Sequence, residues 1–335
     1  MPATRTLSVQ ATADPMGNLK QLLRKVRRLG LDGLYQRVEA LNSMSAIQWN
    51  ALGSLKAQLG DLQARQVRAL PDRAPLRQAE FKVFSQFGDD GILQYLFSRF
   101  PPVDTFIEFG VEDYTEANTR FLLIHDNWRG LILDGRPDLQ RVVDGQGLPF
   151  LHELTARSAF ITAENINDIF IQAGFAGEIG LLSIDIDGND YWVWKAIEVV
   201  HPQVVVVEYN SILGAERALT IPYDPAFTRS KAHPSWLYWG ASLAALCRLA
   251  DDKGYAFVGS NRAGVNAYFV RKDLAAPFQV LTAAEGHVVS RVRESRDAKG
   301  GMSRLGGAAR LEAIADCPMI DLDSGETILL RELIG

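Results

Sequence analysis

The chain has 335 residues, of which 47% are hydrophobic and 22% are charged, and its net charge is −5 at pH 7. This composition is that of a globular protein with one large core and an appendage, and it excludes a mostly disordered chain. Charges or glycines break every apolar run before the ~20 residues of a membrane helix, and no basic start leads into an apolar segment, so we expect a cytoplasmic protein without a transmembrane segment or secretory signal. Cys247 and Cys317 have no C-x-x-C partner and are expected to be packing thiols.

The N-terminal residues, 1–77, have a basic and helical pattern. Between positions 15 and 77 there are 11 Lys and Arg against 4 Asp and Glu. Apolar side chains recur at alternating spacings of three and four, which is typical of a helical hairpin or a short coiled coil, and Gly30 and Gly33 are expected to interrupt the first helix. The seam consists of Leu31, Leu34, Val38, Leu41, Leu52, Leu55, Leu59 and Leu62.

A single helix cannot bury such a row of apolar side chains without a packing partner. We therefore predict that residues 1–77 form a coiled-coil-like extension that joins copies of the chain into a homo-oligomer. The positive charge also allows a peripheral contact with an anionic glycan, a lipid surface or an acidic protein, and a solvated helix face explains it equally well. No nucleic-acid partner is expected.

The body, residues 78–276, alternates strand and helix patterns, which predicts an α/β fold with a parallel sheet and helices on both faces. The expected strands are 105–109, 130–133, 150–154, 180–186, 204–208, 255–259 and 267–271. The expected helices are 116–125, 137–143, 163–173, 191–200 and 241–251, with a long loop at 211–239. Residues 277–335 are polar and weakly patterned, so we expect a peripheral tail that ends in a short strand or helix at 326–334.

Carboxylates gather where the fourth and fifth expected strands end. Asp185, Asp187 and Asp190 surround Gly188 after the fourth strand, and Glu208 ends the fifth. Because ligands of open parallel sheets bind at the carboxyl ends of the strands, this cluster indicates a working site. Asp185 or Asp190 could instead cap the next helix, but capping would account for only part of this carboxylate cluster.

The first strand also ends in acids, because Glu108 and Gly110 are followed by Glu112 and Asp113. A dinucleotide site would show G-x-G-x-x-G here, since pyrophosphate needs bare backbone amides, and two carboxylates would repel it. A cationic, phosphate-free nucleotide such as S-adenosylmethionine suits this turn better. Asp134 follows the second strand 26 residues after Glu108, close to the spacing at which an acid binds ribose hydroxyls.

These segments resemble the class I S-adenosylmethionine-dependent methyltransferases. In detail the chain is similar to the FkbM-type branch, whose fourth strand ends in D-x-E-G-x-E, because Asp185-Ile186-Asp187-Gly188-Asn189-Asp190 matches with aspartate for both glutamates. It also resembles the macrocin-type sugar O-methyltransferases, whose D-G-D-x-Y supplies a magnesium ligand; here Asn189 stands in the third place. The resemblance covers about residues 84–274 and implies a Rossmann-like, seven-stranded methyltransferase sheet.

The resemblance also implies roles for individual residues. Glu108 and Gly110 would bind the methionine end of S-adenosylmethionine, Asp134 would bind its ribose, and Asp185 would also contact the cofactor. Ser85 and Gln86 lie in a segment before the first strand that would fold over the cofactor. Ser85 could instead be a helix N-cap.

Methylation of a hydroxyl needs a base or a metal that lowers its pKa. Asp187, Glu208 and Asn210 offer a hard oxygen set that suits Mg²⁺. Without a metal, Asp187 or Glu208 could be the base, and so could His233, although a lone histidine among Pro and Trp more often packs.

The loop after Glu208 is rich in aromatic side chains, on which a sugar could stack or which could anchor the loop. They are Tyr209, Tyr223, Trp236, Tyr238 and Trp239. We therefore expect an S-adenosylmethionine-dependent O-methyltransferase that acts on a hydroxyl of a sugar, a glycan or a glycosylated small molecule. The alternatives are a glycosyltransferase that uses Asp185-Ile186-Asp187 as a metal-binding D-x-D, and a non-catalytic scaffold that binds S-adenosylmethionine.

Overall fold

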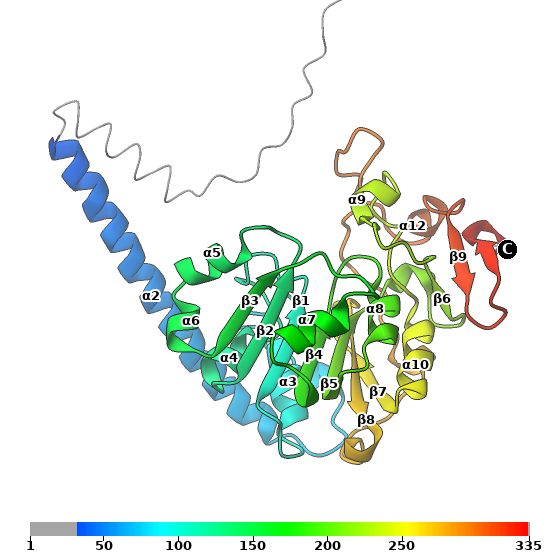
Figure 1. Cartoon of the computed structure of the whole chain (residues 1–335), viewed down its shortest axis with the longest axis horizontal. Coiled ribbons are helices and arrows are strands. Elements are labelled where there is room, and N and C mark those ends of the chain that lie inside the picture. Colours follow the sequence, from blue (N-terminus) through cyan, green and yellow to red (C-terminus); the bar gives the residue numbers. More distant parts are fainter. Residues whose placement is uncertain (1–31, 334–335) are drawn as a thin grey trace, which may run out of the picture. The chain divides into compact units, whose positions relative to one another are not determined.

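The computed structural model describes residues 32–333, and its centre is a seven-stranded sheet in the order β3-β2-β1-β4-β5-β8-β7 (Figure 1). Strands β1 to β5 are parallel, and β8 is antiparallel to both of its neighbours. This is the Rossmann-like methyltransferase sheet that the sequence predicts. The strands are β1 (Thr105–Phe109), β2 (Arg129–Asp134), β3 (Leu154–Ser158), β4 (Gly177–Ile184), β5 (Val200–Glu208), β7 (Tyr255–Ser260) and β8 (Asn266–Arg271).

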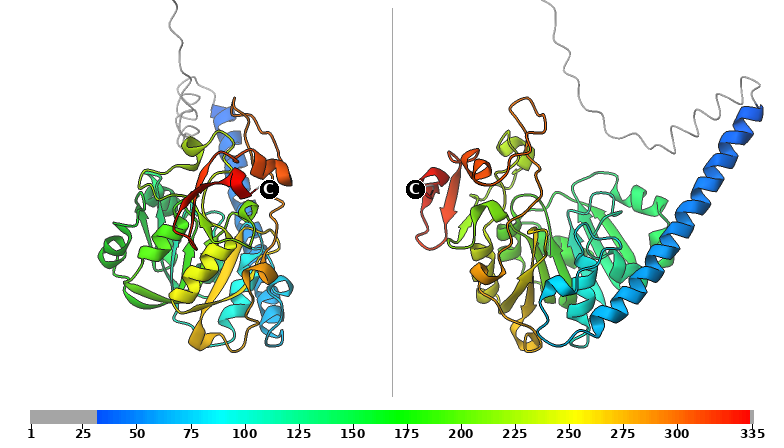
Figure 2. Two further views of the ribbon diagram at one scale, coloured as in Figure 1. Left: turned by 90° about the vertical axis from the view of Figure 1, so that its right-hand side faces the viewer. Right: turned by 180° about the vertical axis from the view of Figure 1, so that it is seen from behind.

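Helices cover both faces of the sheet (Figures 1 and 2). They are α3 (Asp89–Phe97), α4 (Arg120–His125), α5 (Leu139–Gly145), α6 (Leu148–Leu151), α7 (Ile166–Gln172), α8 (Asp190–Ala196) and α10 (Leu243–Asp252). Alternate strand residues enter different cores, because successive side chains of a strand point to opposite faces. Val204 and Val206 join the core with α3, α4 and α5, whereas Val205 and Val207 join the core with α7, α8 and α10.

Several element boundaries differ from the sequence prediction, including those of β3 and α8. The expected strand 150–154 is wrong, since residues 148–151 form α6 and the strand β3 begins only at Leu154. Gly147 at φ +74° and Pro149 in the first turn start a helix there. Phe150 is 91% exposed and therefore does not mark a core strand. Helix α8 ends at Ala196, four residues early, because β5 is longer than expected and begins at Val200.

The C-terminal residues are not a loose tail, because they complete a second sheet. Strands β6 (Leu219–Thr220), β9 (Pro318–Asp321) and β10 (Thr327–Leu329) form it in the order β10-β9-β6, and Ile314, Met319 and Leu330 are buried in a third core with β6. The C-terminal segment therefore packs against the loop after β5 and fixes its position. The remaining short elements are α9 (Arg229–Ala232), α11 (Ala283–Gly286), α12 (Ala308–Glu312), η1 (Leu76–Gln78), η2 (Ser211–Leu213), η3 (Lys272–Leu274) and η4 (Leu330–Leu333).

The N-terminal described element is a single helix, α2 (Asp32–Arg68). Of the hairpin and the short coiled coil that the leucine seam predicts, the hairpin is wrong, and so is the interruption expected at Gly33, since 37 residues form one helix that includes Gly33. Leu31, Gly30 and the residues before them lie outside the described residues. The chain divides into two compact units, one up to Leu59 and one from Gly60 onward, so the last turns of α2 belong to the unit of the sheet.

Within the second unit the end of α2 packs closely. A Cβ on Gly60 would lie 2.7 Å from the Phe121 ring, and Asp61 Oδ1 lies 3.2 Å from His125 Nε2. Several seam leucines are solvent-exposed, including Leu55 and Leu59. Oligomerisation through them stays a prediction. In the part of the chain that the structure covers, no helix has the length and apolar character to span a bilayer, and both cysteines are free thiols.

Candidate active site

A cavity of about 730 Å³ opens where β1, β2, β4 and β5 end at their carboxyl edge. This volume is in the range of small-molecule sites. Carboxylates dominate its wall: Glu108, Glu112, Asp113, Glu116, Asp134, Asp185, Asp187, Glu208 and Glu294 all line it. The acids that the sequence places at four different strand ends therefore share one hollow. Gln86, Gly110 and Asn210 line the cavity as well.

Gly110 sets how closely two strand ends approach each other. Its φ is +79°, and a Cβ on it would lie 1.5 Å from the carbonyl oxygen of Asp185. Its N–H donates to the Leu133 carbonyl at 3.0 Å. Only glycine can occupy this position, because any other residue would push β1 and β4 apart.

Glu108, on β1, links this strand to the loop before α4 by hydrogen bonds. Its Oε1 accepts the Asn118 N–H at 2.8 Å, and its Oε2 accepts the N–H and the hydroxyl of Thr119. The Ser183 hydroxyl is a further donor to Oε1, at 3.4 Å. Burial raises the pKa of Glu108, and these donors partly counter that effect. Glu108 thus fixes the start of α4, while the direct cofactor contact expected from the sequence stays a prediction.

Asp134 keeps acceptor capacity for a ligand. Its Oδ2 accepts the Glu112 N–H and its Oδ1 accepts the Arg136 N–H, each at 2.8 Å. A carboxylate oxygen can accept two hydrogen bonds, so each oxygen retains one open position. The two existing bonds fix the carboxylate plane beside the first turn. Phe160, 54% exposed, also lines the cavity next to Gly135 and offers a ring face there.

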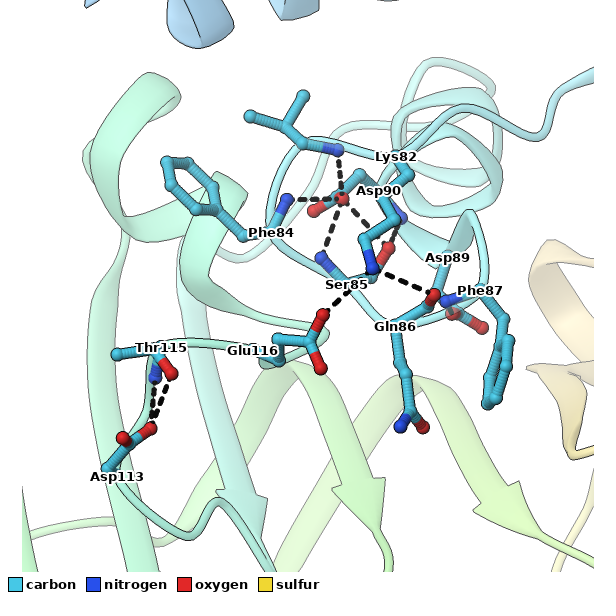
Figure 3. A network of polar contacts seen from close by, with 11 residues as sticks. Lys82, Phe84, Ser85, Gln86, Phe87, Asp89, Asp90, Asp113, Thr115 and Glu116 are labelled. Atoms are coloured by element: carbon cyan, nitrogen blue, oxygen red, sulfur yellow. Dashed lines mark hydrogen bonds and ion pairs between the residues drawn. The ribbon is translucent and has the colours of Figure 1, made fainter. Parts of the chain in front are cut away.

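The segment before α3 is built around the buried carboxylate of Asp90 (Figure 3). Its Oδ2 accepts the backbone N–H groups of Val83, Phe84 and Ser85 and the Ser85 hydroxyl, all at 2.8 or 2.9 Å. Burial raises the pKa of Asp90 to about 6. Ser85 does not line the cavity, so the expected contact with the cofactor is corrected, and the cap of α3 is Gly88 rather than Ser85.

Gln86, together with its neighbour Phe87, is where this segment reaches the cavity. It is exposed, and its amide points away from the Asp90 network (Figure 3). Lys82 donates to the Gln86 carbonyl at 3.1 Å and pairs with Glu116 at 2.8 Å. The segment is therefore fastened to the loop after β1 at the cavity mouth.

Asp185 and Glu208 form an electrostatically strained pair. Burial raises the pKa of Asp185 well above its usual range, and Asp187 and Asp190 raise it further. Burial likewise raises the pKa of Glu208 well above its usual range, and Asp185 adds to the shift. Glu208 Oε2 is buried without a hydrogen-bond partner. The pair therefore retains a proton or attracts a cation near neutral pH.

Three carboxylates are close enough to share one metal ion. Ligand oxygens of Asp185, Asp187 and Glu208 all lie within 4.8 Å of one another. This hard oxygen set suits Mg²⁺, and the unpartnered oxygen of Glu208 fits such a role. The structure thus adds Asp185 to the two acids that the sequence assigns to a metal.

Asn210 has a different use from the metal ligand expected. Its Nδ2 donates to the carbonyls of Leu237 and Trp239 at 3.0 Å, and its Oδ1 accepts the Ile212 N–H at 3.2 Å. The side chain is 1% exposed. It braces the loop after β5, so the sequence-based ligand assignment is corrected.

Asp190 closes the turn after β4 and is not the N-cap of the next helix that the sequence suggests, since Asn189 stands at that position. The Asp190 carboxylate accepts the N–H groups of Ile186 and Gly188 at 2.9 Å, and burial raises its pKa to about 6. Asp187 has φ +56°, in the left-handed region, which aspartate tolerates better than most residues. This conformation presents Asp187 at the cavity, where its side chain is 55% exposed.

Arg229 is a cavity residue that sequence reasoning missed. Its Nη1 pairs with Asp187 Oδ1 at 2.5 Å, its Nη2 lies 3.6 Å from Glu294, and its Nε donates to the Trp236 carbonyl. The guanidinium stacks over the Trp239 ring. Burial alone would lower the pKa of Arg229, but the neighbouring Asp187 and Glu208 outweigh it and raise the pKa. Arg229 therefore neutralises part of the acidic wall.

His233 does not line the cavity, so its expected role as a base is corrected. Its Nδ1 accepts the Ser235 N–H at 3.2 Å and lies 2.8 Å from the Ser235 hydroxyl. Burial lowers the pKa of His233. The histidine shapes the bend after α9 instead.

The aromatic side chains after β5 divide between two uses. Tyr209, Trp236 and Trp239 line the cavity. Tyr238 donates to the Pro318 carbonyl and Tyr223 to Glu164, so these two anchor the loop. The C-terminal segment supplies further cavity residues that the sequence did not indicate, namely Ser290, Val292, Glu294 and Arg310. The sequence around Arg310 has no clear pattern and therefore does not indicate that this side chain reaches the cavity.

Comparison with known proteins gives a partial likeness of fold. No protein-family model matches the chain, and no curated protein matches it. Among solved structures, an O-methyltransferase family protein from Burkholderia thailandensis aligns at 13% identity over 66% of this chain and 59% of that chain, with a TM-score of 0.35. The CurJ carbon methyltransferase aligns at 9% identity over 55% of this chain and 52% of that chain, with a TM-score of 0.35.

The CMeT domain of the citrinin polyketide synthase aligns at 10% identity over 57% of this chain and 55% of that domain, with a TM-score of 0.36. The chain thus spans between about half and three fifths of the length of these proteins. The function is therefore argued from the residues of the cavity.

Proposed function

We propose that this protein transfers the methyl group of S-adenosylmethionine to a hydroxyl of a sugar, a glycan or a glycosylated small molecule. The observation that carries the proposal is the single cavity whose wall combines Gly110, Asp134, Asp185 and Glu208 at the carboxyl ends of four neighbouring strands. A negative wall suits a donor that bears a sulfonium and an ammonium and no phosphate. Glu112 and Asp113 in this wall disfavour the pyrophosphate of NAD or ATP at the donor end of the cavity.

The donor half of the cavity lies at the ends of β1 and β2. Asp134 would accept hydrogen bonds from the two ribose hydroxyls at the positions that Glu112 and Arg136 leave open. Phe160 would stack on the adenine ring, because its exposed face lies in the same wall. Glu108 would act indirectly, since it holds the loop before α4 in place.

The reacting half lies at the ends of β4 and β5. When bound, S-adenosylmethionine supplies an electrophilic methyl group on a sulfonium. In such a transfer the acceptor oxygen would gain the methyl carbon as the carbon–sulfur bond breaks, with the electron pair of that bond left on sulfur. Once the Asp185–Glu208 pair has lost its shared proton, Glu208 takes the hydroxyl proton, because no donor engages its Oε2 and its raised pKa then makes it a stronger base than an ordinary carboxylate. Asp187 is less available, since Arg229 pairs with it.

A divalent metal is compatible with the same residues. Asp185, Asp187 and Glu208 would hold Mg²⁺, which would lower the pKa of the acceptor hydroxyl. Arg229 would then have to release Asp187. Trp236 and Trp239 flank this half and offer the aromatic faces on which sugar rings stack.

Two other functions draw on specific observations. Asp185 and Asp187 lie close together, as a D-x-D glycosyltransferase requires, but Glu112 and Asp113 in the same wall would repel the diphosphate of a nucleotide sugar. A non-catalytic scaffold would need the α2 segment and not the cavity acids. The Asp187→Ala and Glu208→Ala variants would then keep the biological phenotype, whereas deletion of residues 1–77 would abolish it.

The proposal is tested by following the methyl group. The full-length protein would be incubated with methyl-labelled S-adenosylmethionine and a carbohydrate fraction from cells. We expect label in sugars after acid hydrolysis that survives mild alkali, as a methyl ether does, and no label with the Glu208→Gln variant. Alkali-labile label would indicate a methyl ester, and label in protein or nucleic acid alone would contradict a sugar acceptor.

A further inference from the structure

Arg310 is a partly buried cation in the cavity that lacks an anionic partner. Its Nη1 donates to the Ser290 carbonyl at 3.0 Å, and its Nε is buried without a hydrogen-bond partner. Within residues 32–333 no carboxylate pairs with it, although its neighbour Arg229 pairs with two, Asp187 and Glu294. Part of the Arg310 guanidinium is therefore free to bind a ligand.

The surroundings of Arg310 disfavour an unpaired charge. Burial lowers the pKa of Arg310, and the repulsion of Arg229 lowers it further. A buried donor without a partner destabilises a folded chain unless a ligand or water satisfies it. An anion on Arg310 would satisfy the open N–H and offset the repulsion between the two arginines.

The position of Arg310 separates it from the donor half of the cavity. Its helix, α12, packs against η2, which directly follows β5. Asp134, the expected ribose ligand, follows β2, and both β1 and β4 lie between β2 and β5 in the sheet. Arg310 also lies near enough to Arg229, at the start of α9, for the two charges to interact. An anion on Arg310 therefore lies on the acceptor side, where Glu208 ends β5.

We propose that the acceptor carries an anionic group, a carboxylate or a phosphate, which Arg310 binds while the hydroxyl to be methylated faces Glu208. This inference rests on the proposed methyl transfer and narrows its acceptor to a sugar acid, a sugar phosphate or a similarly charged molecule. A planar guanidinium suits both groups, because its parallel N–H bonds match two oxygens of either. Arg229 is already engaged by Asp187 and contributes only its charge.

The test measures binding of charged and neutral sugars to the full-length protein loaded with S-adenosylhomocysteine. The calorimetric probes are glucuronate, glucose 6-phosphate and uncharged glucose, at low salt. We expect one of the two anions to bind at least about tenfold more tightly than glucose, as charge-assisted bonds permit. Glucuronate as the tighter probe identifies a carboxylate acceptor, and glucose 6-phosphate identifies a phosphate acceptor.

Two variants of Arg310 and one control variant test whether Arg310 causes the preference for anionic sugars. Arg310→Met should remove the preference for the anion, whereas Arg310→Lys should keep part of it, since lysine retains the charge without the planar fork. Arg291→Met should keep it fully, because Arg291 is exposed on the same segment and does not line the cavity. All three should bind S-adenosylhomocysteine like the wild type.

Several results would overturn the inference. Equal binding of glucose and both anions by the wild type would exclude an anion subsite, and an unchanged preference in Arg310→Met would place it elsewhere. A loss of S-adenosylhomocysteine affinity in Arg310→Met would assign the guanidinium to the donor's carboxylate. If the wild type does not bind S-adenosylhomocysteine, the proposed function fails, and the same sugar titrations without it still decide whether Arg310 selects anions.

Discussion

Arg229 Nη1 lies 2.5 Å from Asp187 Oδ1, an ion pair that joins the loop after β5 to the turn after β4 across the cavity. Asp187 is therefore partly neutralised, whereas the Oε2 atom of Glu208 is buried without a partner. Of the two acids that the sequence proposes as the base, Glu208 is the one that no arginine engages in an ion pair.

The first prediction concerns this choice of base. Glu208→Gln should lower kcat for methyl transfer by roughly a hundredfold or more, the size of a general-base contribution. Binding of S-adenosylhomocysteine should stay within about threefold of the wild type, because Glu208 lies on the acceptor side. Kinetics and calorimetry on the same preparations measure both. Glu312→Gln, on the exposed surface, is the matched control. A fully active Glu208→Gln enzyme would assign the proton to another group.

The second prediction concerns stability and pH. The folded-state pKa of Glu208 lies above its unfolded value, so protonated Glu208 favours folding at low pH and this contribution is lost as pH rises through the folded pKa. Each unit of the shift corresponds to about 1.4 kcal/mol. Urea unfolding at pH 5 and pH 8 should show a smaller loss of stability with rising pH in Glu208→Gln than in the wild type.

Mg²⁺ extends this second prediction. A metal would replace the proton shared by Asp185 and Glu208, so Mg²⁺ should raise the stability of the wild type more at pH 8 than at pH 5. Added Mg²⁺ should raise the stability of the Glu208→Gln variant less than that of the wild type. Identical responses of both proteins at both pH values would argue against a metal at these three carboxylates.

The third prediction uses two glycines that line the same cavity. Gly110→Ala should lower the free energy of unfolding by about 3 kcal/mol or more, because a clash with the Asp185 carbonyl adds to the strain of a positive φ. Gly135→Ala should change it by less than about 0.5 kcal/mol, since its Cβ would meet only a Phe160 ring atom at 3.9 Å. Chemical denaturation of both variants compares them. Equal stabilities would contradict the close approach of β1 and β4.

The fourth prediction concerns the leucine seam of α2. Leu55 and Leu59 are 57% and 60% exposed, and their spacing continues the heptad-like pattern of the sequence. If the seam joins copies of the chain, Leu55→Glu with Leu59→Glu should reduce the mass measured by light scattering to that of a monomer. Lys56→Glu, on the same turn, should leave the mass unchanged. A wild-type monomer would refute the oligomer.

The sequence was sufficient to predict the seven-stranded sheet, because the strands of that sheet are buried on both faces. Runs such as Val204–Val207 are apolar at every position, and only a covered parallel strand needs that. The same signal fails at Phe150, which is apolar but exposed in a short helix. Acids at the strand ends could be grouped because carboxyl ends of parallel strands meet at one edge of the sheet.

The rest of the site depends on contacts that no local pattern encodes. Ser85 and His233 have suitable chemistry, but hydrogen bonds to Asp90 and Ser235 engage them away from the cavity wall. Arg229 and Arg310 reach the cavity from a loop and from the C-terminal segment, and their paths are set by the second sheet. Residue type therefore identified the acids, whereas tertiary packing decided which cations face them.

The most direct test of the central claim is calorimetric titration of the full-length protein with S-adenosylhomocysteine and, separately, with UDP in the presence of Mg²⁺. We predict that S-adenosylhomocysteine binds, that UDP does not, and that Asp134→Ala weakens the binding at least about tenfold, because it loses two hydrogen bonds to a charged acceptor. Binding of UDP without binding of S-adenosylhomocysteine would contradict the assignment of the acidic cavity to a cationic methyl donor.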